Sequence, residues 1–135
     1  MDRDNMRFGE YIRFQRLRRE ITLREMSEAL GISLSMLSDI EQMRKKPFNT
    51  QAIDRFCRYL GLSEDERIRI LDMAAIERGK VPSDLNNIMM NTDIGDMARF
   101  ALRMSNAGYA DAEDWKKFIW EIERKRKHSI RHTFL

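Results

Sequence analysis

Apolar residues recur at helical spacing along most of the chain, whereas the alternation typical of β-strands is scarce. Ser, Thr, Asn and Asp stand where helices should begin, twice with a Glu three residues later, as in a capping box. Glycines follow several of the apolar runs and mark helix ends. The expected helices cover about 6–19, 23–30, 33–42, 50–60 and 64–78, then two that begin near Ser83 and Thr92, and 112–127. The sequence therefore predicts an all-α protein.

The composition leaves two alternatives for the domain boundary. A chain of 135 residues suffices for one compact domain or for a small domain with an appendage. We place a first domain at 1–62 and a helical region at 63–127. Residues 128–135 are expected to be a frayed tail, because "HSIRHTFL" has no helical period. The segment "GKVPS", at 79–83, is the alternative boundary, since Gly and Pro interrupt the helical pattern there.

Charge is distributed unevenly along the chain, although the net charge is only +3. Residues 1–61 contain 12 Lys/Arg against 9 Asp/Glu, residues 62–122 contain 8 against 12, and residues 123–135 contain 5 against 1. A basic head, an acidic middle and a basic tail suggest that these segments have different tasks. The modestly basic head is compatible with binding to nucleic acid but does not require it.

Several functional classes find no support in the sequence. No apolar run approaches the roughly 20 residues that span a membrane, and the first residues show no secretory signal. The single cysteine, Cys57, cannot form an internal disulfide, which fits a reducing cytoplasm. His128 and His132 are four residues apart, but no third metal ligand accompanies them. Because no acid–base pair, metal cluster or phosphate-binding loop is recognisable, we expect neither an enzyme nor a cofactor.

The segment 34–42 has two different faces when it is placed on a helical wheel. One face holds Met36, Leu37, Ile40 and Glu41, and the other holds Leu34, Ser35, Ser38, Asp39 and Gln42. A glutamate on the core side is unfavourable unless a cation pairs with it. Arg16, on the inward edge of the first helix, is the candidate partner of Glu41. The pattern indicates a helix that is anchored on one face and free on the other.

The free face of this helix has the residue types of a helix that reads DNA. Short hydroxyl side chains let the backbone approach a duplex, and polar groups can meet base edges in the major groove. Arg44, Lys45 and Lys46 follow directly, in a loop that suits phosphates. Two short helices joined by "GIS" match a helix-turn-helix, whose second helix enters the major groove. The amides at the helix starts after Thr22 and Ser33 can also bind phosphate oxygens.

Residues 8–62 resemble the Cro/repressor-type (Xre-like) helix-turn-helix family of bacterial and phage regulators. The resemblance runs through "IRFQRLRREITLREMSEALGIS", "LSDIEQMRKKP" and "AIDRFCRYLGL" and extends over four helices. It implies a lambda-repressor-like helix-turn-helix domain of four to five helices, followed by a smaller helical C-terminal region. It also implies a structural ion pair between Arg16 and Glu41, which agrees with the helical wheel.

The same resemblance assigns roles in the binding of double-stranded DNA. The base-reading positions are occupied by Leu34, Ser35, Ser38 and Asp39. The phosphate-contact positions are occupied by Thr22, Leu23, Arg24, Arg44, Lys45 and Lys46, to which the helix start at Ser33 is added. Because members of the family usually bind paired half-sites, a homodimer is expected.

Four residues depart from the pattern of the family. Leu23 stands where glutamine is frequent, and the neighbouring Arg24 is a potential substitute for that polar contact. Glycine is usual where Glu20 and Met43 stand, and a left-handed backbone at these points would cost roughly 1 kcal/mol each. Asp39 repels phosphate, so it either accepts a hydrogen bond from a cytosine amino group or neutralises a nearby arginine. We prefer the second interpretation.

The C-terminal half is expected to mediate oligomerisation. On the last helix Trp115, Phe118, Ile119 and Ile122 form one stripe, and Trp120 lies outside it. An aromatic residue in that place is either part of a second packing face or an exposed anchor for a partner. A second protein, a toxin or a co-regulator, is a further candidate to bind these helices.

The preferred hypothesis is a cytoplasmic, sequence-specific DNA-binding transcriptional repressor that reads the major groove with helix 33–42. The first alternative is an antitoxin that binds its own promoter with the same head and a toxin with its C-terminal half. The second is an interaction module that no longer binds DNA, suggested by Leu23 and Asp39. Co-purification with a neighbouring gene product would identify the antitoxin, and a gel shift without sequence preference at low salt would identify the interaction module.

Overall fold

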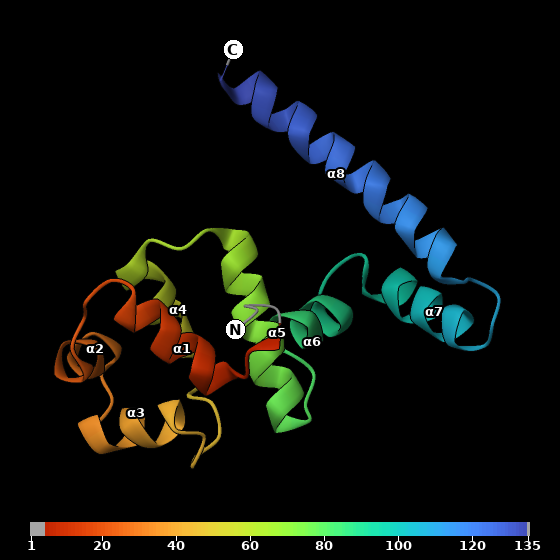
Figure 1. Cartoon of the computed structure of the whole chain (residues 1–135). Helices are drawn as coiled ribbons and strands as arrows, with labels where there is room; N and C mark the ends of the chain where they lie inside the picture. Colours follow the sequence, from red (N-terminus) through yellow and green to blue (C-terminus); the bar gives the residue numbers. More distant parts are fainter. Residues whose placement is uncertain (1–4, 135) are drawn as a thin grey trace. The chain divides into compact units, whose positions relative to one another are not determined.

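The chain divides into two units, Met1–Asn86 and Asn87–Leu135. The computed structural model describes the backbone of residues 5–134 and the side chains of residues 5–128. Within that part all regular secondary structure is helical, so the prediction of an all-α fold is confirmed (Figure 1). The helices are α1 (Phe8–Leu17), α2 (Leu23–Leu30), α3 (Leu34–Glu41), α4 (Thr50–Leu60), α5 (Glu64–Arg78), α6 (Ser83–Asn91), α7 (Gly95–Asn106) and α8 (Ala112–Phe134).

Side-chain caps fix the starts of α2 to α5. The side chains of Thr22, Ser33, Asn49 and Ser63 each accept a hydrogen bond from a backbone amide three residues later. Such caps satisfy amides that have no partner inside the helix. The expected cap at Thr92 is wrong, because its hydroxyl donates to the carbonyl of Ile88 at the end of α6 and Ile94 precedes α7.

Helices α1 to α5 surround one hydrophobic core in the first unit. Phe48, in the loop before α4, joins the helices, since its ring meets the edge of the Phe8 ring at 4.9 Å between centroids. The helical spacing of α1 predicts that Leu17 faces inward with Phe8 and Ile12, but Leu17 is half exposed, because α1 ends there and the chain turns away. The core consists of Phe8, Tyr11, Ile12, Met26, Leu30, Leu37, Ile40, Phe48, Ala52, Ile53, Phe56, Cys57, Ile70, Leu71 and Ala74.

Gly9 allows α1 to cross the end of α3 at very short range. A Cβ atom at this position would lie 2.1 Å from the carbonyl oxygen of Ile40, which no side chain tolerates. The backbone of α1 therefore lies directly against the last turn of α3. This crossing sets the position of α3, the helix that carries the candidate site.

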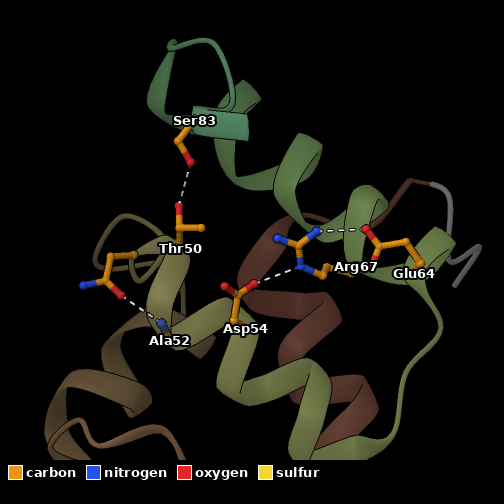
Figure 2. Close-up of polar contacts among 7 residues, drawn as sticks. Thr50, Ala52, Asp54, Glu64, Arg67 and Ser83 are labelled. Atoms are coloured by element: carbon orange, nitrogen blue, oxygen red, sulfur yellow. Dashed lines mark hydrogen bonds and ion pairs between the residues drawn. The ribbon is translucent and has the colours of Figure 1, made fainter. Parts of the chain in front are cut away.

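Helix α5 belongs to the first unit. The amide of Phe8, at the start of α1, donates to the Glu77 carboxylate at 2.9 Å. Arg67 donates to Asp54 of α4 at 2.9 Å, and the hydroxyls of Thr50 and Ser83 lie 3.2 Å apart (Figure 2). The unit thus extends past residue 62, where we placed the boundary, and ends nearer the alternative at 79–83.

The second unit has no comparable core: among its residues 87–128, Gly95 is the one that is buried. The indole N–H of Trp115 in α8 donates to the Ser105 hydroxyl of α7 at 2.6 Å. Asp111 caps α8 by accepting from the amide of Asp114 at 3.0 Å. The two helices are thereby joined at the start of α8.

Helix α8 extends to Phe134, beyond the expected end near residue 127. Residues 128–134 are helical rather than frayed, because neither Gly nor Pro interrupts the chain after the cap; Leu135 lies outside the described residues. Among the helices of residues 5–134, none combines the length and the apolar character that crossing a membrane requires.

Candidate nucleic-acid interface

Helix α3 is anchored to the first unit by one face. Leu37 is fully buried, Ile40 is 1% exposed and Glu41 is 4% exposed. Met36, which the helical wheel placed on the same face, is 38% exposed, so that expectation is wrong. Met36 is one residue, or about 100°, away from Leu37 on the wheel and therefore lies at the edge of the buried face.

Arg16 and Glu41 form a bidentate ion pair between α1 and α3. The Nε and Nη2 groups of Arg16 donate to the two carboxylate oxygens of Glu41, both at 2.8 Å. The Nη1 group donates to the carbonyl of Ile21 at 2.8 Å and so holds the turn between α1 and α2. Hydrogen bonding to Glu41 raises the pKa of Arg16 although burial opposes this, so the guanidinium stays charged. One side chain thus ties together the three segments that position the candidate site.

The opposite face of α3 is open to solvent in part. Leu34 and Ser35 are exposed, and Ser38 and Asp39 are half-buried. Gln42 is also exposed and donates its side-chain amide to the Ser38 hydroxyl at 3.0 Å. The helical wheel places Gln42 on this face, although it is not among the predicted base-reading residues. Its amide carries a further donor and an acceptor that can meet base edges.

The phosphate-contact candidates at the helix starts differ in what they can offer. The hydroxyl of Thr22 is already hydrogen-bonded to Glu25. It accepts a hydrogen bond from the Glu25 amide at 3.1 Å and donates one to the Glu25 carboxylate at 2.9 Å. Leu23 packs partly buried against the core, so only its backbone amide can serve a phosphate. Arg24 is exposed. The Ser33 hydroxyl caps α3 and leaves the first amides of that helix for an anion.

The loop after α3 presents Arg44, Lys45 and Lys46 as exposed side chains. The amide of Arg44 donates to the backbone carbonyl of Asp39 at 2.8 Å, which fixes the start of the loop. The Asp39 carboxylate lies 3.9 Å from both Arg44 Nη1 and Lys45 Nζ. This geometry supports the interpretation that Asp39 neutralises neighbouring cations. Exposed pairs of this kind are worth only about 0–1 kcal/mol, so phosphates can displace the carboxylate.

Two non-glycine residues adopt the left-handed conformation at the ends of α1 and α3. The φ angle is 55° at Glu20 and 62° at Met43. These are the two positions where the resemblance suggested glycine. The chain therefore keeps the left-handed backbone geometry that glycine favours. Residues with a Cβ atom are strained in this geometry.

Other chemistry is not assembled in the described part of the chain. The Cys57 thiol is buried, and burial raises its pKa to about 11, so it is not a thiolate at neutral pH. Among residues 5–128 no group of three or more His, Cys, Asp or Glu side chains is placed to hold a metal ion. His128 lies in this range, whereas the side chain of His132 lies outside the described residues.

An exposed helix preceded by a tight turn and held by a buried ion pair defines a helix-turn-helix module. Residues 7–69 match the family described as "Helix-turn-helix domain". Residues 7–69 therefore form a helix-turn-helix domain, as the resemblance to Cro/repressor-type (Xre-like) regulators implies.

A solved structure entitled "SinR protein/SinI protein complex" is similar to the chain at 16% identity and a TM-score of 0.42. The alignment covers 90% of this chain and 98% of that one. No curated protein matches the chain significantly.

Proposed function

We propose that the protein is a sequence-specific DNA-binding transcriptional repressor that acts as a homodimer in the cytoplasm. One observation carries the proposal: the open face of α3 is followed by three exposed cations, within a matched helix-turn-helix domain. The helix enters the major groove and reads bases through Leu34, Ser35 and Ser38. Occupation of the operator blocks access of the polymerase.

Phosphate contacts set the register of the domain on the duplex. They come from the amides at the starts of α2 and α3, from Arg24 and from the loop with Arg44, Lys45 and Lys46. Asp39 exchanges its neighbouring cations for phosphates when DNA binds, because the ion pairs at 3.9 Å are exposed and weak. Two domains bind half-sites about one helical turn apart, roughly 34 Å.

Selection of bound sequences from a random duplex pool tests this proposal. We expect an enriched motif with two-fold symmetry and half-sites spaced by about 10 base pairs. Replacing Ser35 and Ser38 by alanine should change the enriched bases, because these residues face the groove. Enrichment of no motif at low salt would contradict the proposal and favour an interaction module.

The salt dependence of binding tests the loop separately. Replacing Lys45 and Lys46 by alanine should weaken binding to all sequences and lower the slope of log K against log salt by roughly one unit per lost phosphate contact. Replacing Lys80 and Lys117, which are exposed and lie outside residues 7–69 and outside the apolar face of α8, removes the same charge and serves as a control. An unchanged slope in the Lys45/Lys46 variant would remove the loop from the interface.

A further inference from the structure

Helix α8 presents an apolar stripe that is uncovered in the described part of the chain. Phe118 is 58% exposed, Ile119 51% and Ile122 40%. At 100° per residue these side chains share one face with Trp115. Trp115 is half-buried and bonded to Ser105, so α7 covers only the beginning of the stripe. Contiguous exposed apolar surface of this kind marks an interaction site.

Charged residues flank this stripe in a self-complementary order. On one flank Lys116 is followed two turns later by Glu123, and on the other flank Asp114 is followed by Lys125. Each flank therefore carries opposite charges at its two ends. Both pairs are centred between residues 119 and 120, within the apolar stripe that extends from Trp115 to Ile122.

We infer that α8 pairs in antiparallel orientation with α8 of a second copy of the chain. When Ile119 of one copy packs near Ile119 of the other, Lys116 comes opposite Glu123 and Asp114 comes opposite Lys125. Each contact occurs twice, as an interface with two-fold symmetry requires. The inference rests on the proposed function, in that it names the surface through which the regulator forms its dimer.

Charge argues against the other arrangements of this surface. A parallel pair would place the basic run 124–127 beside its own copy, which is repulsive. An antiparallel pair instead brings that run to the acidic start of the partner helix at 111–114. The helix dipoles are then antiparallel as well, which is favourable. An unrelated protein would not require both flanks of α8 to be complementary to themselves about one point. The second copy therefore accounts for the pattern.

Sedimentation equilibrium of the full chain tests the pairing through charge reversal. We expect the parent to be a dimer and Lys116→Glu to weaken it by roughly tenfold or more, because two attractive contacts become repulsive. Glu123→Lys should weaken it to a similar extent. The double variant K116E/E123K restores opposite charges and should bring the dissociation constant back to within about threefold of the parent.

Two further variants control this experiment. Lys117→Glu makes the same charge change on the opposite side of α8 and should leave the dimer unchanged. Ile119→Asp removes an apolar contact at the centre and should abolish the dimer whatever the charges are. Circular dichroism of each variant at high concentration checks that the helices are retained.

The outcomes separate the pairing from the proposed function. Three results would overturn the pairing: a parent that is monomeric at all concentrations, a dimer that survives Ile119→Asp, or a double variant whose dimer stays weak. They would indicate that the first unit or another protein covers the apolar stripe of α8. Binding of each variant to a single half-site is measured in parallel. A monomer that binds the half-site contradicts the pairing alone, whereas a dimer that binds no DNA contradicts the proposed function alone.

Discussion

The two units of the chain bury apolar side chains to very different extents. In the first unit Phe8, Tyr11, Ile12 and Phe56 are inaccessible to solvent, and the core draws on α1 to α5. In the second unit large apolar residues such as Trp120 remain more than half exposed. Because burial of apolar surface is the main favourable term in folding, the first unit gains much more stability from its own core than the second, as expected if the exposed stripe of α8 pairs with a second copy.

Ion pairs show the same contrast. Arg16 and Glu41 meet at 2.8 Å, with side chains that are 10% and 3% exposed. Arg124 and Glu121 in α8 also meet at 2.8 Å, but their side chains are 62% and 46% exposed. Breaking the two ion pairs should therefore cost different amounts of stability although their distances are equal. Water screens an exposed pair, whereas the loss of one partner from a buried pair leaves a buried charge without compensation.

The largest effect is expected for Glu41→Ala. This change leaves the guanidinium of Arg16 buried without its partner and should lower the free energy of unfolding of the first unit by about 3–5 kcal/mol. Both tryptophans, Trp115 and Trp120, lie in the second unit, so their fluorescence follows that unit, whereas circular dichroism follows both. The transition seen by circular dichroism should shift, and the fluorescence transition should not.

Glu121→Ala is the matched control for this prediction. It removes the carboxylate of an ion pair with the same distance in α8, where the side chains are exposed. We expect a change in the free energy of unfolding of at most about 0.5 kcal/mol. Similar effects of the two substitutions would show that burial does not distinguish the pairs.

The faces of α3 could be predicted from the sequence because they follow from local spacing. A glutamate among apolar residues at 3.6-residue spacing requires a cation, and Arg16 supplies it. The helix caps are also local, since the cap and the amide that it accepts are three residues apart. The caps need no knowledge of the rest of the fold, whereas the choice of Arg16 as the partner of Glu41 also rested on its place on the first helix and on the resemblance.

Features that depend on neighbouring elements could not be predicted in the same way. The predicted boundary at residue 62 leaves out α5, whose contacts with α1 and α4 through Glu77 and Arg67 join residues far apart in sequence. Met36 was misplaced because a helical wheel gives angles and not the extent of the surface that covers them. The base-reading residues remain predictions, since the identity of a bound base depends on the duplex as well as on the side chain.

The second-largest expected effect, after that of Glu41→Ala, is a loss of stability at alkaline pH that is confined to the first unit. Burial raises the pKa of Cys57 to about 11 from 9.0 for an ordinary thiol. Above pH 9.0 the unfolded chain loses this proton and the native state keeps it, so the free energy of unfolding falls until about pH 11. The loss is up to about 1.4 kcal/mol per pH unit.

Denaturation of the parent and Cys57→Ala between pH 8 and 11 measures this loss. The alanine variant lacks the thiol and should show a flatter pH dependence by circular dichroism, although truncation lowers its stability at every pH. The second unit contains no cysteine, so tryptophan fluorescence should show no difference between the two proteins. Parallel pH curves by circular dichroism would contradict the assigned burial of the thiol.

The smallest effect concerns left-handed backbone, which the two units provide differently. In the first unit two non-glycine residues, Glu20 and Met43, have positive φ angles in addition to Gly31, Gly61 and Gly79, whereas the positive φ angle among the described residues of the second unit is that of Gly108. Glu20→Gly and Met43→Gly should each raise the free energy of unfolding of the first unit by up to about 1 kcal/mol, because strain is relieved. Part of this gain is offset by the greater freedom of glycine in the unfolded chain.

Gly108→Ala is the inverse change in the second unit. The space around Gly108 is open to a Cβ atom, so the expected loss of about 1 kcal/mol arises from the φ angle of 95° and not from a clash. Chemical denaturation followed by circular dichroism and by tryptophan fluorescence assigns each change to its unit. If Met43→Gly destabilised the protein, contacts of the Met43 side chain would have to outweigh its backbone strain, and the end of α3 would be fixed by packing rather than by conformation.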